Sequence, residues 1–262
     1  MSKKEKKKGR MGGIIRNLVL IIAAAVFLFS AYQLVMIYLE YKKGTDEYDK
    51  IRQYAVESPV KEETKEKDEA EGEEEGEEAQ EVQEPQGPQI DFEALKAVNP
   101  DVVGWIEIET LDISYPIVQT TDNDHYLHYT FEGQRNANGA IFLEHTNSSD
   151  FEDCNTIIYG HNMKNGSMFN NIKSYTDQSF ADEHPYVYIY LPDGTVSQYK
   201  VVVGHIISET SVLYNTHIVD TASFVQEMVK TSSIKVDFDQ SQVQSVITLS
   251  TCTSAGSESG KR

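Results

Sequence analysis

The apolar positions divide the chain into three zones, and the first zone is one long run. Residues 18–39 are apolar apart from Ser30 and Gln33. A helix of this length reaches about 33 Å, which is enough to cross the hydrocarbon core of a membrane. The run exceeds the ~7–15 residues of a signal-peptide core, and no A-x-A cleavage site directly follows it. We therefore expect an uncleaved transmembrane helix, with a cleaved signal peptide as the alternative.

Residues 40–90 form the second zone, which becomes strongly acidic. Between residues 61 and 84 the chain is mostly Glu with almost nothing apolar, and Pro85 and Pro88 follow. Such a segment cannot offset the entropy of ordering by burial, and its like charges keep it extended. We expect a disordered acidic linker that holds the following domain away from the bilayer. An acidic ligand-binding tail is the alternative.

From Asp91 onward the pattern changes to short apolar runs separated by turn residues. Runs rich in β-branched and aromatic residues favour strands. Seven strands are expected, at residues 104–108, 113–119, 140–143, 156–159, 186–191, 198–207 and 246–251. This close spacing predicts a mostly β domain over residues 91–262, a closed or nearly closed β-barrel with short peripheral helices.

Two of these helices have recognisable start signals. Asp91 is an N-cap residue before an apolar run that stops at Pro100. Ser223 and Gln226 have the spacing of a capping box, which predicts a helix that begins there.

The charge distribution predicts how the chain is oriented across the membrane. Residues 1–60 carry a net charge of +5, residues 61–90 carry −10, and residues 91–262 carry −14, which gives −19 for the chain. The basic residues concentrate in segment 1–17, which is expected to stay in the cytoplasm while the remaining chain faces outward. The acidic domain argues against nucleic-acid binding, because that function needs a basic face.

The chain has two cysteines, Cys154 and Cys252. They lack the paired spacing of a metal site, and we expect two free thiols, with one disulfide between them as the alternative. Cys252 ends an apolar strand and precedes a small, polar stretch. A strand end is rigid on one side and open on the other, which suits a nucleophile. Carboxylates flank Cys154 and oppose a thiolate, so we assign that thiol no role.

His161 has the same placement as Cys252, because it follows an apolar strand and Gly160. Paired strand-end positions are what a Cys/His site needs. Arg262 supplies a fixed positive charge that can hydrogen-bond an oxyanion. His125 and His128 have metal-like spacing, but no further residue completes a ligand set, and we interpret them as structural.

These motifs together resemble one family. The sequence TLSTC at residues 248–252, the sequence YGH at residues 159–161 and an Arg ten residues after the cysteine are similar to a sortase, and TLSTC is similar to class B. The resemblance extends over about 170 residues. It includes the VGWI sequence at 103–106 and the YPIVQ sequence at 115–119.

The resemblance implies an eight-stranded barrel enzyme on the outer face of a Gram-positive membrane. Such an enzyme cleaves a C-terminal sorting signal, LPxTG-like or NPxTN-like, after Thr through a cysteine thioester. It then transfers the acyl group to an amine of a peptidoglycan precursor or of another surface protein. No metal or organic cofactor is needed.

The resemblance also assigns residues. It implies three catalytic residues, which are Cys252, His161 and Arg262. It implies four residues of the substrate groove, which are Ser250, Thr251, Asn123 and Leu127. Residues 213–218 fall where groove contacts are expected, although His217 departs from the usual aromatic residue.

The chain departs from the family at its end. It stops at Arg262, whereas sortases continue into a final strand, so we expect that strand to be missing from this chain. Two other functions stay open. One is a cell-wall cysteine peptidase, although papain-like enzymes place Cys before His along the chain. The other is a non-enzymatic anchored adhesion or scaffold domain.

Overall fold

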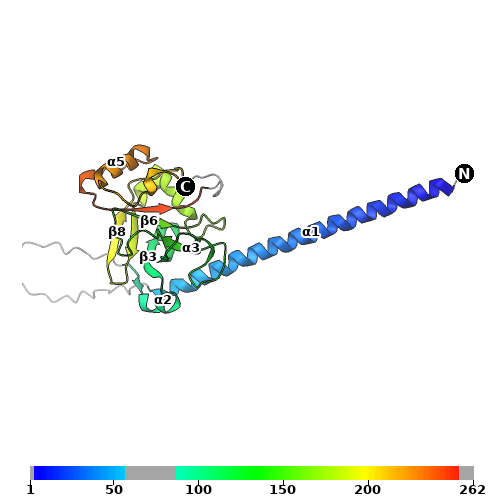
Figure 1. The fold of residues 1–262 in the computed structure, drawn as a ribbon, viewed down its shortest axis with the longest axis horizontal. Helices are drawn as coiled ribbons and strands as arrows, with labels where there is room; N and C mark the ends of the chain where they lie inside the picture. Colours follow the sequence, from blue (N-terminus) through cyan, green and yellow to red (C-terminus); the bar gives the residue numbers. More distant parts are fainter. Residues whose placement is uncertain (1–2, 57–86, 254–262) are drawn as a thin grey trace, which may run out of the picture.

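The computed structural model describes residues 3–56 and 87–253. A long N-terminal helix, α1 (Lys3–Ile51), extends away from a body that is built around a β-sheet (Figure 1). The sheet has seven strands, which are β3 (Val102–Ile108), β4 (Ile113–Val118), β5 (Ile141–Leu143), β6 (Asn155–Tyr159), β7 (Tyr186–Tyr190), β8 (Val196–Lys200) and β9 (Val246–Ser250). Four short helices accompany it, which are α2 (Phe92–Val98), α3 (His125–His128), α4 (Gln178–Glu183) and α5 (Thr221–Thr231).

The strand order is β8-β7-β3-β4-β5-β6-β9. The β4–β5 and β6–β9 pairs are parallel, and the other pairs are antiparallel. The mostly β, nearly closed barrel expected from the sequence is confirmed. The eighth strand that the family resemblance implied does not occur among the described residues.

All seven predicted strands occur, and one is much shorter than predicted. The run at 198–207 contributes strand only as far as Lys200, and residues 201–207 pair with no neighbouring strand. The pattern could not show this, because apolar residues such as Val201 also pack against the core from an irregular segment.

The core lies between the inner faces of the strands. Trp105, Ile117, Ile141 and Ile157 have 0 % exposure and come from β3, β4, β5 and β6. Burying each side chain of this size stabilises the fold by about 1.5–3 kcal/mol. The central strands of the sheet that carries the candidate site are therefore firmly packed.

The helix start signals gave one correct and one wrong prediction. The Asp91 side chain accepts a hydrogen bond from the Ala94 N–H at 2.9 Å and caps α2, as expected. The predicted capping box at Ser223 is wrong, because α5 begins at Thr221 and Asp220 is its N-cap. The Asp220 carboxylate accepts hydrogen bonds from both the backbone N–H and the hydroxyl of Ser223.

The structure corrects the predicted start of the linker at residue 40. Helix α1 continues to Ile51, and its last turns are buried against the body, with exposures of 6 % for Glu47, 4 % for Tyr48 and 2 % for Ile51. Gly44, Tyr48 and Ile51 are spaced by four and three residues, so they share one face of the helix. This face was overlooked because charged residues on the other faces dominate the local composition.

A short two-stranded sheet joins the residues after α1 to the residues that open the rest of the body. Strand β1 (Ala55–Val56) pairs antiparallel with β2 (Gln89–Ile90), with Val56 opposite Gln89. The chain therefore leaves and re-enters the body at one place. Residues 57–86, which hold most of the predicted disordered linker, lie outside the described residues. Its predicted role as a spacer stays a prediction.

The apolar run of α1 lies outside the body. Its side chains are exposed, with Phe27 at 72 % and Leu28 at 66 %. Among the residues that the structure describes, α1 is the one helix that is long and apolar enough to cross a membrane, judged by length and composition.

Candidate active site

The site lies where two parallel strands end. Strands β6 and β9 are parallel neighbours with Tyr159 opposite Ser250. His161 and Cys252 each follow these paired residues by two positions, so both leave the sheet at the same edge. The Gly160 N–H donates to the Ser250 carbonyl at 3.0 Å and extends the pairing towards them. The fold thus brings together two residues that are 91 positions apart in the sequence.

Asn162 ties the histidine segment to the cysteine. Its side-chain amide donates to the Cys252 carbonyl at 2.7 Å, and its side-chain oxygen accepts from the Asn170 amide at 2.5 Å. Asn162 also forms a β-bridge with Met168. These contacts fix the backbone of Cys252 from the side of His161. The Cys252 side chain is half-buried and is not in a disulfide.

The imidazole of His161 is held by the backbone of a neighbouring segment. Its Nε2 lies 2.9 Å from the Leu127 carbonyl oxygen. A carbonyl can only accept, so Nε2 carries a hydrogen in this arrangement. Gly139 packs against the ring, because a Cβ built there would lie 2.9 Å from His161 Cδ2. Gly160 is equally confined, since its Cβ would lie 2.5 Å from Ile141 Cδ1.

A buried carboxylate connects the residues beside the site. Glu144 directly follows β5 and is 8 % exposed. It accepts hydrogen bonds from the Asn123 amide at 2.6 Å and from the Tyr159 hydroxyl at 2.9 Å. His145 Nδ1 lies 2.7 Å from its other oxygen. These partners, together with the N–H and hydroxyl of Thr146 at 3.4 Å, compensate for the burial of the carboxyl group.

The same network continues to Ser250. The Tyr214 hydroxyl and the Ser250 Oγ are 2.8 Å apart. The Tyr214 ring stacks on Tyr159, with centroids 6.4 Å apart and an interplanar angle of 11°. Asn123, Glu144, Tyr159, Tyr214 and Ser250 therefore form one continuous polar wall, which we call the Glu144 wall. Two of the residues assigned to the substrate groove, Asn123 and Ser250, belong to it.

The segment at 213–218 is hydrogen-bonded to the β6–β9 pair, and its role in groove contacts stays a prediction. The Asn155 side chain donates to the carbonyls of Leu213 and Asn215 and accepts from the Thr248 hydroxyl. Tyr214 brings its ring to the Glu144 wall. The backbone N–H of His217 is bound by the Asn215 side chain.

Two of the residues assigned to the substrate groove, Thr251 and Leu127, are not part of this wall. The Thr251 hydroxyl oxygen is buried and has no hydrogen-bond partner within the described part of the chain. Arg262 lies outside the described residues, so its role stays a prediction. Leu127 contributes its carbonyl to His161.

The second thiol lies far from the first. Cys154 precedes β6 and its carbonyl accepts from the Val246 N–H, so it sits at the start of the β6–β9 pair, and Cys252 sits at the end. A five-residue strand separates the two ends by about 17 Å. A disulfide needs Cα atoms about 4.4–6.8 Å apart. The expectation of two free thiols is confirmed.

Sequence reasoning missed several residues of the site. Glu144 and Asn162 were not assigned roles in it, although Glu144 follows an apolar strand as His161 and Cys252 do. The strand-end rule could have found Glu144. The contact of Asn162 with Cys252 depends on the path of a loop, which local pattern does not specify.

Comparisons with known proteins agree on one family. A sortase-domain family model matches residues 106–262. Sortase B of Listeria monocytogenes is 38 % identical over 167 residues, which are 60 % of this chain and 65 % of that protein. Sortase B of Staphylococcus aureus is 28 % identical over 253 residues, which are 94 % of this chain and 93 % of that protein. The structure of a Staphylococcus aureus sortase B–substrate complex matches with a TM-score of 0.60 at 30 % identity, covering 65 % of this chain and 80 % of that one.

The chain spans just under two thirds of the Listeria relative's length, and nearly all of the Staphylococcus relative's. The family model matches more than half of the chain, including His161 and Cys252. The chain therefore belongs to the sortase family, and its relatives place it with the class B sortases.

Proposed function

We propose that the protein is a cysteine transpeptidase that cleaves a sorting signal after Thr and transfers the acyl group to an amine. The observation that carries this proposal is the parallel β6–β9 pair, which delivers His161 and Cys252 to one edge of the sheet. Family membership supplies the reaction class. The solved neighbour described as a sortase B–substrate complex supports a peptide substrate.

The chemistry proceeds in two steps. The Cys252 thiolate attacks the Thr carbonyl carbon and forms a C–S bond. The C–N bond then breaks as protonated His161 gives its proton to the leaving amine. An incoming amine attacks the thioester, loses a proton to His161 and releases Cys252 as thiolate. Arg262 and a backbone N–H near Cys252 stabilise the oxyanion in both steps.

The contact between His161 and Leu127 selects the nitrogen that exchanges this proton. Because the Leu127 carbonyl occupies Nε2, that nitrogen keeps its hydrogen in both the neutral and the charged ring. The transferred proton therefore belongs to Nδ1. The same carbonyl fixes the plane of the ring relative to the sheet edge.

The Glu144 wall is the proposed side of the substrate groove. Asn123 and Ser250 contribute to it through their bonds to Glu144 and Tyr214. The Leu127 side chain adds an apolar surface next to His161. Thr251 contacts the substrate through its backbone, since its hydroxyl oxygen is buried.

The proposed setting is the outer face of a membrane. The apolar run of α1 is long enough to span the hydrocarbon core, and its basic flank at residues 1–17 favours a cytoplasmic N-terminus. The acceptor amine would then come from a peptidoglycan precursor or from another surface protein.

The test is a peptide panel. The purified full-length chain is incubated with LPxTG-like and NPxTN-like peptides, each with and without a glycine peptide as acceptor, and products are identified by mass spectrometry. We expect cleavage after Thr and a product in which the acceptor amine is joined to Thr. Hydrolysis without transfer in the presence of acceptor would favour a cysteine peptidase. Binding without turnover of any peptide would favour a scaffold domain.

A further inference from the structure

The last turns of α1 pack against residues 127–139, the segment that leads into β5. The Tyr48 hydroxyl donates to the Gly139 carbonyl at 2.6 Å and accepts from the Phe131 N–H at 3.2 Å. The Tyr48 side chain is buried, and burial raises the pKa of its phenol well above the usual range. The hydroxyl therefore keeps its hydrogen and acts as a constant donor.

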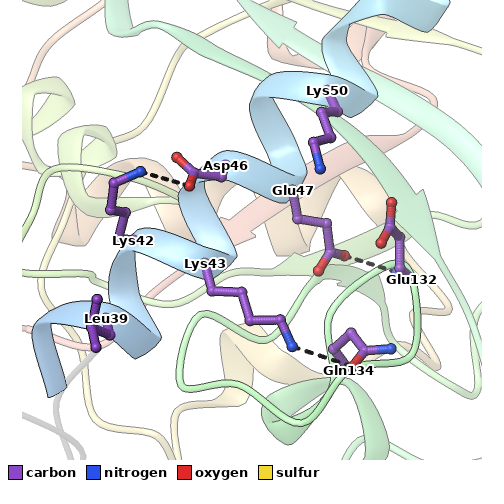
Figure 2. Close-up of a pocket in the computed structure, with 8 residues that line it drawn as sticks. All are labelled: Leu39, Lys42, Lys43, Asp46, Glu47, Lys50, Glu132 and Gln134. Atoms are coloured by element: carbon purple, nitrogen blue, oxygen red, sulfur yellow. Dashed lines mark hydrogen bonds and ion pairs between the residues drawn. The ribbon is translucent and has the colours of Figure 1, made fainter. Parts of the chain in front are cut away.

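Glu47 adds a second attachment one residue earlier. Its carboxylate accepts from the Thr130 hydroxyl at 2.8 Å and from the Glu132 N–H at 2.9 Å. Figure 2 shows Glu47 and Glu132 beside a pocket that α1 and this segment line, with Lys43 reaching across to Gln134. The volume of the pocket is about 490 Å³. The segment is thus tied to the helix at several points along its length.

The close approach of helix and segment depends on a glycine. A Cβ built on Gly44 would lie 2.6 Å from Asn138 Nδ2 and 2.9 Å from Asn136 Oδ1. Both asparagines are buried, with exposures of 0 % and 4 %, so neither side chain has space to move aside. The Asn136 amide in turn donates to the Glu40 carbonyl at 2.9 Å.

Residues of the same segment also hold His161. The Leu127 carbonyl binds Nε2 of the ring, and Gly139 lies directly against Cδ2. Gly139 has φ +54°, so its conformation already favours glycine. Leu127 and Gly139 are the two ends of the segment that packs against α1. The segment therefore contacts both α1, through the Gly139 carbonyl, and the imidazole, through the Leu127 carbonyl and Gly139.

A second contact path reaches the loop after His161. The Tyr48 ring packs edge-on against Tyr115, with centroids 5.3 Å apart. The Tyr115 hydroxyl accepts from the Met168 N–H at 3.2 Å. The Asn165 amide donates to the Thr45 hydroxyl, also at 3.2 Å. Helix α1 thus contacts both the segment that holds the imidazole and the loop that follows His161.

We propose that Tyr48 is a positioning residue for His161. The helix that carries the apolar run then also helps to orient a catalytic side chain. Tyr48 fixes the Gly139 carbonyl, and Gly139 supports the imidazole of His161. The imidazole therefore keeps the orientation that proton exchange needs. The contacts described above are the basis for the effect of Tyr48 on the orientation of the imidazole. Its consequence for turnover rests on the proposed transferase function.

The experiment compares four forms of the full-length chain in lipid nanodiscs. They are the wild type, Tyr48→Phe, Gly44→Leu and the control Asp49→Ala, whose side chain is exposed on the other side of the helix. The imidazole of His161 is followed by NMR with labelled histidine, and its signal is assigned through its loss in His161→Gln. Transfer kinetics and thermal unfolding are measured on the same samples.

We expect Tyr48→Phe to shift the His161 signal and to lower kcat about 10-fold with KM nearly unchanged, the scale of a small misplacement of a catalytic group. Gly44→Leu, which separates the helix from the segment, shifts the His161 signal further and lowers kcat more than Tyr48→Phe does. Asp49→Ala matches the wild type. A merely structural role predicts instead that the folded fraction alone changes, with the His161 signal of the folded form unmoved.

The proposal is overturned if the His161 signal is the same in the wild type, Tyr48→Phe and Gly44→Leu. Failure of the transferase function is a different result, in which the wild type shows no turnover. In that case the NMR comparison still tests whether Tyr48 positions His161, because it does not depend on turnover. If Tyr48→Phe does not fold, Gly44→Leu gives the same comparison.

Discussion

At the scale of single residues, the position of Cys252 depends on Asn162. The Asn162 amide donates to the Cys252 carbonyl, and Asn170 holds the Asn162 side chain in the correct rotamer for that bond. An amide offers both a donor and an acceptor, which a carboxylate does not. Replacing the amide by a carboxylate would place two acceptors against each other.

We predict that Asn162→Asp lowers kcat/KM for transfer by about 10-fold or more, because two facing acceptors displace the Cys252 backbone. Steady-state kinetics with a sorting-signal peptide measures the loss. Asn171→Asp is the control, since Asn171 makes only long contacts to the carbonyls of Leu111 and Gly166. Equal losses from both changes would mean that Asn162 has no particular link to Cys252.

Arg262 is predicted to stabilise the oxyanion through its planar pair of donors. Arg262→Lys keeps the charge but loses the fork, so turnover should fall on the order of 10²-fold, the scale for loss of one oxyanion donor. Alkylation of Cys252 by a small reagent should be unchanged, because the thiol remains. Arg135→Lys is the matched control, since Arg135 is exposed. A lysine variant with near-normal turnover would contradict the assigned role.

The sequence predicted residues of the site where a strand-end rule applies. His161 and Cys252 each follow an apolar run, and the structure places both at one edge. The carbonyl of Leu127 and the side chain of Asn162 could not be predicted in the same way. Their roles depend on where the backbone of a loop passes, and the local apolar pattern carries no information about that path.

At the scale of elements, the β6–β9 pair organises the site. Its strands were recognisable from their apolar residues, but their pairing joins residues about 90 positions apart. Pairing and register are decided by which faces bury each other in the finished sheet. Alternation within one strand does not identify its partner. The expected meeting of His161 and Cys252 therefore rested on the family resemblance, not on strand pattern alone.

Helix α5 provides a prediction with a definite dependence on pH. Ser223 donates two hydrogen bonds to the Asp220 carboxylate, and they lower the pKa of Asp220 below its usual value of 3.8. The stabilisation from the carboxylate is present above the pKa of the unfolded chain and is lost as the pH falls through the folded pKa. Asp220→Ala should therefore lower Tm at pH 7, and the difference from the wild type should shrink below about pH 4.

Thermal unfolding at pH 7, 5 and 3 measures this difference. Asp237→Ala serves as the control, because Asp237 is an exposed carboxylate that is not the N-cap of a helix. A Tm difference for Asp220→Ala that stays constant across the three pH values would show that the ionised carboxylate is not what caps α5.

At the scale of the whole molecule, α1 joins the apolar run directly to the body. The sequence indicated the run and the body, yet it suggested a spacer where the structure has a docked helix. The average composition of a segment does not predict whether a helix end docks on a neighbouring domain. A few residues on one helical face, among them Tyr48 and Ile51, decide the docking, while the charged residues around them dominate the average.

This architecture predicts a topology. With residues 1–17 in the cytoplasm, protease added outside intact cells should digest the body and spare the N-terminal segment, because the basic flank is retained inside. Immunoblots with tags at either end of the chain measure the fragments. A body that is protected in intact cells but digested after lysis would mean that the chain has the inverse orientation.

The central claim is that Cys252, and not Cys154, forms a thioester with the sorting signal. The direct measurement is intact-protein mass spectrometry after mixing the full-length chain with the best peptide of the panel in the absence of acceptor. The wild type and Cys154→Ala should both gain the mass of the peptide up to Thr, hydroxylamine should remove that mass, and Cys252→Ala should gain nothing. An adduct on Cys252→Ala, or loss of the adduct in Cys154→Ala, would contradict the account.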